Sequence, residues 1–448
     1  MSIATGITLE ELIRDGFCQP DSLLLYAVGI IEAESSTGYV QYQISPKKHR
    51  FKSWLISHTS DHIHKEGGEM TIDIIFNMTS VCPHDCPVCC IDATHVTRRG
   101  DKVVLRTDGL KTKYRIHHGD RTKSIYDVAA SELQTLGREL SLDQKLTILS
   151  NIDVQGVRLD ISGGDPLVVT DNITVLAAAS SQLGRHNISL TATGSGLVNV
   201  NLSELVQLVS EFNFTYDSAS ADDVSDRPKS YAASNLAVAR KLSALGAVTR
   251  AEFPITRSTN NEDHLKRLYM HLHEAGVNKL LLMRLFPSGR GATVEDKTLT
   301  RSEYLAAVFQ LRRLELEFGS PAVKLQCALR HIESGTDVLS ASAVNPCDMV
   351  TESFGLTPLG DLLASPWAIN GFGAPHPDYV LGNLLETRLS EILRSQKVDE
   401  FRRRANENFG HCKIFAERFS LRKTTFERMH DKTDPLYSAQ SIRSIAAE

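Results

Sequence analysis

The sequence has no surplus of basic residues and no apolar segment long enough to cross a membrane. Its 49 Lys and Arg against 54 Asp and Glu give a formal net charge of −5, which does not favour nucleic-acid binding. The best apolar run, Ser22 to Ile31, is much shorter than the roughly 18 residues of a transmembrane helix. Residues 1–16 carry acidic residues and no apolar core, so we expect no signal peptide. These absences predict a cytoplasmic protein without nucleic-acid or membrane partners.

Two common catalytic motifs are also missing. Gly194-Ser195-Gly196 lacks the full spacing of a nucleophile elbow, and no Gly-x-x-x-x-Gly-Lys phosphate loop occurs. The composition, 42% hydrophobic and 23% charged, is ordinary for a folded globular protein. With 448 residues, the chain can form one large barrel with additions, or two domains.

Cysteine is sparse except in one place. Four of the eight cysteines, Cys82, Cys86, Cys89 and Cys90, fall within nine residues. In a large intracellular protein such a group indicates metal or redox chemistry instead of disulfides. Thiolates spaced like the first three can hold three irons of a cubane cluster and leave the fourth iron open. A zinc site completed by His84 or by a distant cysteine is the alternative.

Strand patterns alternate with helix patterns from residue 71 onward. We expect strands at 71–77, 157–162, 187–193, 212–217, 247–254 and 279–286, and helices at 142–152, 172–183, 202–212, 230–245, 263–275 and 301–318. This alternation predicts a parallel sheet, either open or curved into a partial barrel. Ligand sites in such sheets lie at the carboxyl ends of the strands, where the cysteines and several polar residues stand.

The cysteine spacing after the first strand resembles that of the radical S-adenosylmethionine (radical SAM) enzymes. The Ser-Gly-Gly-Asp-Pro-Leu segment after the second strand is similar to the family's Gly-Gly-Glu-Pro motif, with Asp165 in place of Glu. Gly163 and Gly164 would let the backbone approach a ligand closely. The resemblance therefore implies that Gly163, Gly164 and Asp165 contact SAM. By itself, the segment would be a strand-to-helix turn with Asp165 as the N-cap.

Polar residues after later strands extend the resemblance. Thr191 and Thr193 match the third strand that faces SAM in the family, and Asp217 matches a polar position near the ribose. Each of the three can instead be an ordinary turn residue. Arg250 and Glu252 share one face of the fifth strand.

The resemblance implies an α/β fold, a partial (β/α)6 barrel of the radical SAM type with N-terminal and C-terminal extensions. The expected divisions are an N-terminal extension at 1–70, the barrel at 71–292 with an insertion at about 93–138, a C-terminal extension at 293–412 and a tail at 413–448. Cys82, Cys86 and Cys89 would hold a [4Fe-4S] cluster whose open iron binds SAM. An electron donor such as flavodoxin or ferredoxin would drive SAM cleavage to a 5′-deoxyadenosyl radical, which removes hydrogen from a substrate carbon.

The C-terminal extension is similar to the SPASM/Twitch regions that bind auxiliary clusters, but its cysteine set is incomplete. Ser365 occupies the place of one expected cysteine, which leaves Cys327, Cys347 and Cys412. Three interpretations stay open. The three residues hold a second Fe–S cluster, or Cys347 or Cys412 donates a hydrogen atom from its thiol, or they are buried structural cysteines.

The motifs together look similar to proteusin-type peptide epimerases. That similarity implies a ribosomally made peptide substrate, whose α-hydrogen is removed and replaced from a cysteine thiol; a cross-linking peptide maturase is a close neighbour. One alternative is a radical SAM enzyme acting on a sugar or nucleotide, with Arg284 and Arg290 holding a phosphate. Another is a non-enzymatic iron–sulfur or zinc protein, which would not cleave SAM.

Overall fold

A ten-stranded sheet forms the centre of the molecule. The computed structural model describes residues 31–35, 40–44, 71–107, 114–117, 121–198, 200–219, 223, 225–293, 297–333 and 345–437. Within them, the sheet has the order β13-β12-β11-β10-β9-β8-β3-β14-β15-β16. Its strands are β3 (Ile72–Thr79), β8 (Val157–Gly163), β9 (Ile188–Thr191), β10 (Glu211–Thr215), β11 (Val248–Ile255), β12 (Lys279–Arg284), β13 (Ala322–Leu325), β14 (Ser353–Leu356), β15 (Asp361–Leu363) and β16 (Val380–Asn383). A separate antiparallel pair, β1 (Ile31–Ser35) and β2 (Val40–Ile44), lies in the expected N-terminal extension.

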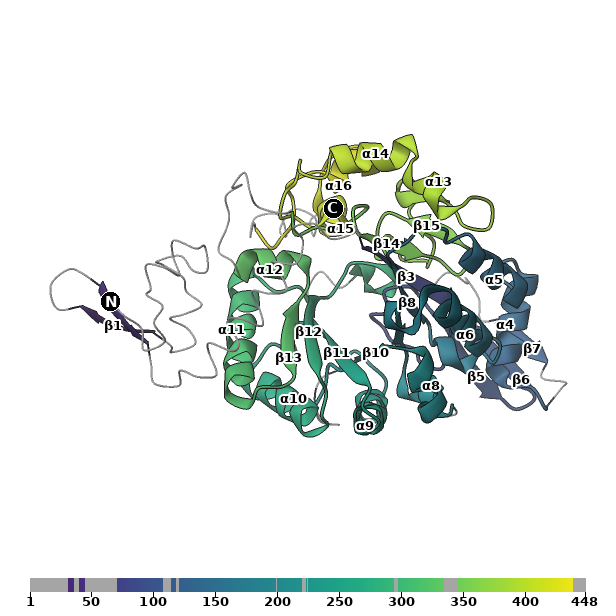
Figure 1. The fold of residues 1–448 in the computed structure, drawn as a ribbon, viewed down its shortest axis with the longest axis horizontal. Coiled ribbons are helices and arrows are strands. Elements are labelled where there is room, and N and C mark those ends of the chain that lie inside the picture. Colours follow the sequence, from purple (N-terminus) through teal and green to yellow (C-terminus); the bar gives the residue numbers. More distant parts are fainter. Residues whose placement is uncertain are drawn as a thin grey trace.

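The strands from β13 to β14 all run parallel, and they curve into a partial barrel (Figure 1). The six expected strands are confirmed as β3 and β8 to β12. Two parallel strands were not expected: β13 continues the rhythm beyond residue 292, and β14 comes from the C-terminal extension to pair with β3. These two strands lie at opposite ends of the parallel series, so the barrel is open. The domain boundaries remain predictions.

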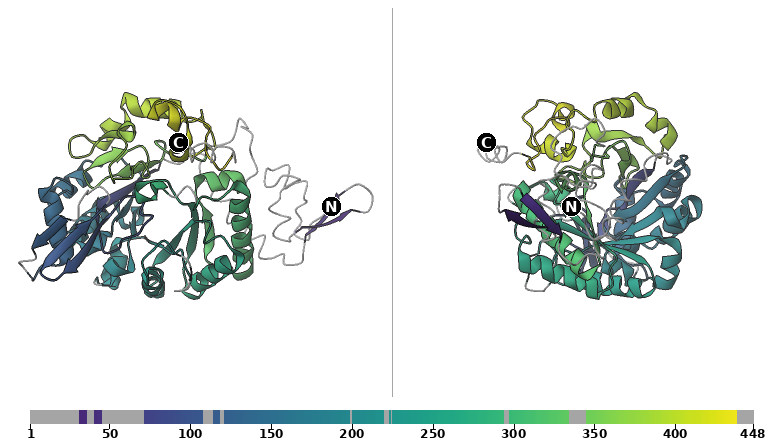
Figure 2. Two further views of the ribbon diagram at one scale, coloured as in Figure 1. Left: turned by 180° about the vertical axis from the view of Figure 1, so that it is seen from behind. Right: turned by 60° about the vertical axis from the view of Figure 1, so that its left-hand side comes forward.

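The predicted helices cover the outside of the curved sheet (Figures 1 and 2). They are α5 (Leu142–Ser150), α6 (Asn172–Leu183), α8 (Leu202–Leu208), α9 (Tyr231–Ala244), α10 (Glu262–Glu274) and α11 (Arg301–Phe318). α11 begins at a capping box formed by Thr300 and Glu303 and ends at Gly319, whose φ of 82° closes the helix. These capping residues can be recognised in the sequence, which explains why the predicted and observed bounds of α11 coincide.

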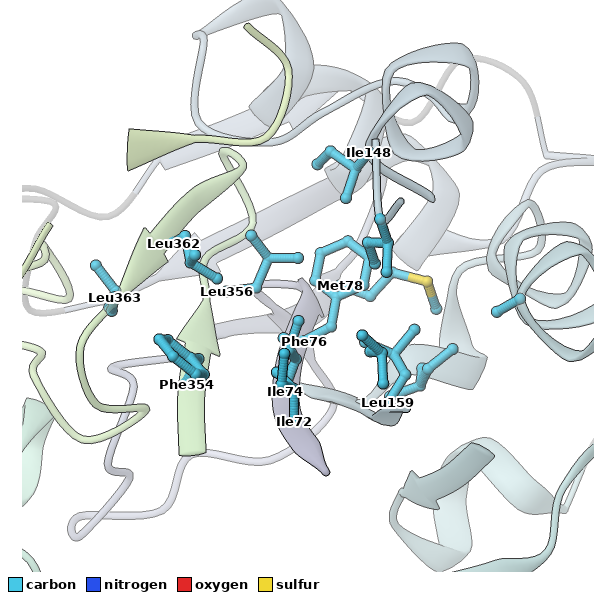
Figure 3. Close-up of a cluster of buried hydrophobic side chains, with 14 of the residues drawn as sticks. Ile72, Ile74, Phe76, Met78, Ile148, Leu159, Phe354, Leu356, Leu362 and Leu363 are labelled. Atoms are coloured by element: carbon cyan, nitrogen blue, oxygen red, sulfur yellow. The ribbon is translucent and has the colours of Figure 1, made fainter. Parts of the chain in front are cut away.

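The largest core cluster lies between the sheet and its covering helices (Figure 3). Burial alternates along the first half of β3 and is continuous from Phe76 to Thr79, and Phe76 is paired in register with Leu356 of β14. Ile148 of α5 and Leu159 of β8 belong to the same cluster. Full burial of such side chains contributes about 1.5–3 kcal/mol each, so β14 is held to the barrel by its side chains as well as by its ladder.

The segment expected as an insertion is a folded unit. β4 (Val81–Cys82), β5 (Thr94–Arg99), β6 (Lys102–Arg106) and β7 (Tyr114–His117) form a second sheet beside α4 (Ile125–Thr135). Its own core contains Val81, Val96, Leu105 and Leu133. Because Cys82 itself belongs to β4, this unit anchors the start of the cysteine segment.

The C-terminal region packs against the barrel through a buried ion pair. It contains α12 (Cys327–Glu333), α13 (Leu389–Leu393), α14 (Gln396–Arg403), α15 (Lys413–Phe419) and α16 (Thr425–Met429). Arg284, the last residue of β12, bonds to both carboxylate oxygens of Asp434 at 2.7 and 2.8 Å, and its guanidinium lies 3.5 Å from the ring centre of Phe415. Both charged side chains are at most 2% exposed, and breaking such a pair costs about 3–5 kcal/mol. In the part of the chain that the structure describes, no helix is both long and apolar enough to cross a membrane.

Candidate cluster and cofactor site

The cysteine loop, residues 82–93, follows β4 at the mouth of the barrel. Cys82 and Cys86 are each 6% exposed, Cys89 is half-buried, and all three thiols are free. The backbone N–H of His84 donates to Cys82 Sγ at 3.4 Å, and that of Ala93 donates to Cys89 Sγ at 3.3 Å. Such N–H···S bonds orient the sulfur that accepts them.

A largely buried arginine supplies positive charge beside the loop. Arg227 is 13% exposed and donates from Nε to Asp217 Oδ2 at 3.0 Å. Burial raises the pKa of Cys82 and of Cys86, while Arg227 opposes that rise at Cys86. Metal binding requires the thiolates, so the arginine favours the form that a metal centre needs. Asp217 therefore contacts Arg227, the cation that reaches a predicted cluster ligand.

The donor set consists of three cysteines on one loop. Among the described residues, no group of three or more His, Cys, Asp or Glu side chains is arranged to hold one metal ion. A zinc site requires its ligands to meet at one ion, whereas each thiolate of a cubane binds a different iron. Three cysteines on one loop, two of them well buried, suit the second case, and Cys82, Cys86 and Cys89 would hold such a cluster.

The Gly-Gly turn after β8 packs directly on the backbone that leads into the cysteine loop. Gly164 N donates to Thr79 O, and Asp165 N donates to Val81 O, both at 2.8 Å. A Cβ on Gly163 would lie 2.3 Å from Thr79 O, and one on Gly164 would lie 2.3 Å from Val81 O. These contacts require glycine at both positions. The resemblance implied that Gly163 and Gly164 let the backbone approach a ligand. In this structure, the atoms closest to both glycines are backbone atoms of residues 79–81.

Asp165 joins the turn after β8 to the segment after β9. It is fully buried, accepts from Leu167 N at 3.2 Å and Gly196 N at 3.0 Å, and accepts from the Thr193 hydroxyl. Burial raises the pKa of its carboxyl to about 6. The N-cap interpretation is therefore realised, because Asp165 caps the turn that begins at Pro166. Thr193 in turn caps α7 (Gly194–Leu197), so both polar groups already have partners.

His84, weighed above as a fourth zinc ligand, contacts the α7 side instead. Its Nε2 lies 3.1 Å from Ser195 Oγ, and its ring meets Tyr231 edge-on at 4.8 Å between centroids. Burial lowers the pKa of His84 to about 4, so the imidazole is neutral at ordinary pH. The cysteine loop is thus tied to the segments after β9 and β10.

The loop after β12 packs on the other side of the cysteine loop. Arg290 Nε donates to Cys86 O at 2.8 Å, Arg290 Nη1 donates to Asp92 Oδ1 at 3.1 Å, and its backbone N–H donates to Cys89 O at 2.9 Å. A Cβ on Gly289 would lie 2.5 Å from Cys89 O. Arg290 therefore binds the cysteine loop, and Arg284 binds Asp434. The two arginines suggested for a substrate phosphate are both engaged by the protein itself.

A polar network lines the interior of the barrel. Thr191 donates to both carboxylate oxygens of Asp160 at 3.0 Å, and Asn213 Nδ2 lies 3.4 Å from Asp160 Oδ2. Arg250 pairs with Glu252 at 3.2 Å, so the expected shared face of β11 does point inward. Burial, aided by Glu252, raises the pKa of Asp160 to about 7. Thr191 is thus hydrogen-bonded to a carboxyl group, and its contact with SAM stays a prediction.

Sequence reasoning did not identify Asp160 or Arg227. In β8 the apolar residues Val157, Leu159 and Ile161 alternate with polar ones, and nothing in that pattern sets Asp160 apart from Arg158 or Ser162. Arg227 stands in a polar loop after β10, where nothing distinguishes it from a surface cation.

The three C-terminal cysteines come together from separate elements. Cys327 begins α12, Cys347 precedes β14, and Cys412 caps α15. The pKa of Cys327 is raised by burial and further by the nearby Cys412, Asp348 and Cys347. Burial and Asp434 raise the pKa of Cys412 to about 12. The cluster, thiol-donor and structural interpretations all remain consistent with this grouping.

We predict that Gly164→Ala displaces the cysteine loop. The added methyl group meets backbone atoms, which cannot rotate away, so we expect a loss of roughly 2–4 kcal/mol and of most bound iron after anaerobic reconstitution. Urea unfolding and iron and sulfide analysis measure both. Gly371→Ala is the matched control, because its Cβ has no neighbour closer than 3.8 Å. Equal iron content in the two variants would contradict the prediction.

We predict that Asp160 makes the protein less stable as pH rises. Its carboxyl keeps its proton in the folded state up to about pH 7, whereas the unfolded chain loses it near pH 4. Between these values the folded state binds more protons, so the free energy of unfolding falls by about 1.4 kcal/mol per pH unit for this group. Denaturant unfolding at several pH values should show that slope reduced by one proton in Asp160→Asn. An unchanged slope would show that Asp160 titrates normally.

Comparisons with known proteins concern the fold. No protein-family model and no curated protein matches the chain. SuiB from Streptococcus suis bound to its precursor peptide SuiA superposes with a TM-score of 0.53 and 10% identity over 88% of this chain and 78% of SuiB. SuiB bound to S-adenosylmethionine gives a TM-score of 0.50 with the same identity and coverage. HemN from Escherichia coli, a radical SAM enzyme, gives 0.37 and 10% identity over 56% of this chain and 54% of HemN.

The open parallel barrel, the thiol-bearing loop at its mouth and the likeness to SuiB agree with the architecture that the motifs implied. The chain has the partial-barrel fold of the radical SAM enzymes that its sequence resembles.

Proposed function

We propose that this protein is a radical SAM enzyme that acts on a ribosomally made peptide in the cytoplasm. The observation that carries the proposal is the clamped cysteine loop, with three free thiols at the mouth of an open barrel. When bound, the cluster and SAM would supply a 5′-deoxyadenosyl radical able to remove a hydrogen atom from carbon. The remaining tasks, which are orientation and exclusion of water, belong to the protein.

Individual residues have definite parts in this proposal. Cys82, Cys86 and Cys89 hold the iron, and Arg227 offsets negative charge at Cys86. Gly163 and Gly164 are half-buried, so their backbone groups remain accessible to the ammonium of SAM. Asp165 acts through Thr193 and α7, by holding that backbone in place.

A peptide is the substrate class that the comparisons favour. SuiB, a solved structure that superposes with a TM-score of 0.53, was determined with its precursor peptide. The sugar or nucleotide alternative loses its main argument, because Arg284 and Arg290 are bound to Asp434 and to the cysteine loop.

Epimerisation is the finer part of the proposal, and Cys412 is its candidate hydrogen donor. A donor must be a neutral thiol, and burial beside Asp434 keeps Cys412 protonated. Cys412 N also donates to Asp434 Oδ2 at 2.9 Å, which fixes the residue relative to Arg284 and the end of β12. Cys347 is half-buried and remains the second candidate.

We predict that the anaerobically reconstituted protein forms 5′-deoxyadenosine from SAM with titanium(III) citrate. The Cys82/Cys86/Cys89 triple alanine variant should lose this activity by at least about 100-fold, because no cluster can then bind SAM. Liquid chromatography with mass spectrometry measures the product. A wild-type protein that carries a full cluster but forms no product, even with a candidate ribosomal peptide substrate, would contradict the proposal.

We predict that Cys412→Ser separates hydrogen abstraction from hydrogen return. With that peptide in D2O, the wild type should introduce deuterium at an α-carbon, whereas the variant should still form 5′-deoxyadenosine but give no deuterated epimer. Cys327→Ser is the matched control, and loss of the deuterated epimer in Cys347→Ser instead would assign the donor to Cys347. If the three residues instead hold a second cluster, each serine variant will lose roughly four irons per chain.

A further inference from the structure

A groove with a basic lining lies beside the cysteine loop. It has a volume of about 480 Å³ and runs between the loop after β12, residues 369–376 and the α15–α16 segment. We call it the arginine groove and define it by Pro287, Ile369, Arg418, Leu421, Arg422 and Arg428.

The arginine groove is basic, although the chain as a whole is acidic. Three arginines and one glutamate, Glu417, line it, although the protein has a net charge of −5. Arg428 pairs with Glu417 at 2.9 Å and donates to Lys423 O at 3.1 Å, which holds the turn that carries Arg422. The Arg422 side chain is 67% exposed and forms an ion pair with Asp431 at 3.7 Å. Three arginines against the carboxylates of Glu417 and Asp431 leave these residues with a net positive charge.

Two large apolar side chains stand beside this charge. Leu421 is 82% exposed and Phe372 is 71% exposed, the highest values for large apolar residues in the described ranges. Leu421 lines the groove, and Phe372 follows the lining residue Gly371. Exposed apolar residues surrounded by basic ones are typical of a protein-binding surface.

One loop separates the groove from the candidate cluster ligands. Ser288 Oγ donates both to Cys90 O at 2.8 Å and to Ile369 O at 3.2 Å. Gly289 N donates to Ile369 O at 3.1 Å, and the next residue, Arg290, donates to Cys89 O at 2.9 Å. Hydrogen bonds of residues 288–290 thus connect Ile369, in the wall of the groove, to Cys89 and Cys90 in the cysteine loop. Electron transfer slows steeply with distance, so an electron carrier gains most by docking where the covering layer is thin.

We propose that the arginine groove is the docking site of an acidic flavodoxin-type protein that delivers one electron to the cysteine-loop cluster. The inference rests on the proposed function, since a radical SAM reaction consumes one electron. The carrier's anionic flavin hydroquinone would lose one electron to become the neutral semiquinone. That electron would break the carbon–sulfur bond of SAM to give methionine and the 5′-deoxyadenosyl radical, which becomes 5′-deoxyadenosine on taking hydrogen from the substrate. Acidic side chains of the carrier would face Arg418 and Arg422, and its apolar centre would meet Leu421 and Phe372.

The test compares two reductants on the reconstituted holoenzyme. Reduced acidic flavodoxin requires docking, whereas titanium(III) citrate is a small reductant that does not. Arg422→Glu and the Arg418→Glu/Arg422→Glu double variant reverse charge in the groove. Arg313→Glu on α11 is the matched control, because Arg313 is 54% exposed and forms an exposed ion pair. Iron content and circular dichroism check that each variant is folded and loaded.

The double variant should lose about tenfold or more of the flavodoxin-driven rate at low salt, with the single variant between it and wild type. Its titanium-driven rate should stay within about twofold of wild type, and the wild-type flavodoxin rate should fall as salt is added. Equal losses with both reductants, or no loss with flavodoxin, would overturn the docking site. A loss of peptide affinity without a loss of flavodoxin-driven reduction would assign the groove to the peptide instead.

Flavodoxin binding to the loaded protein, followed by calorimetry, is independent of turnover. Weaker binding to the double variant but not to Arg313→Glu supports the inference even if no SAM is cleaved, and equal binding to all variants contradicts it. The wild-type reaction with titanium(III) citrate tests the proposed function separately. A failure of the docking site can therefore be distinguished from a failure of the proposed function.

Discussion

Backbone-to-backbone contact on both sides of the cysteine loop is the constraint on which the site depends. Gly164 meets Val81 O on one side and Gly289 meets Cys89 O on the other, each at a separation that leaves no room for a side chain. The thiols therefore hold their positions because two distant segments, the turn after β8 and the loop after β12, clamp the chain that carries them. A metal centre held by three ligands from one short loop needs such external support, since the loop alone has few contacts to fix its shape.

Charge around this clamp is arranged so that the carboxylates are already satisfied. Asp165 is bound by backbone N–H groups and Thr193, and Asp217 is bound by Arg227. The cations Arg227 and Arg290 are left facing the loop itself. Burial raises the pKa of Cys82 and of Cys86, and Arg227 opposes that rise at Cys86. The arginine therefore favours the thiolate form that metal binding requires.

The sequence was sufficient for elements whose signals are local. α6 and α11 were predicted with the observed bounds because periodicity and glycine stops mark them, and all six expected strands occur within a few residues of their predicted positions. β14 was not predicted because its four residues show no strand periodicity. They form a strand only by pairing with β3. The Gly-Gly-Asp turn was located correctly, yet its glycines face the protein's own backbone, and only tertiary structure reveals that. Asp160 and Arg227 were missed for the same reason, since no motif distinguishes a single charged residue whose partners lie on other strands.

The ion pair between Arg284 and Asp434 connects the end of β12 to the C-terminal segment that contacts Cys412. Arg284 ends β12, directly before the loop whose Arg290 holds Cys86 and Cys89 in place. Asp434 also accepts from the backbone of Cys412, so the candidate thiol donor is tied to the same strand. A reaction that removes hydrogen at one face of a substrate carbon and returns it at the other needs its two reactive groups at a constant separation. A buried ion pair at the end of a barrel strand provides that constancy, because moving either group would leave an unpaired charge in the core.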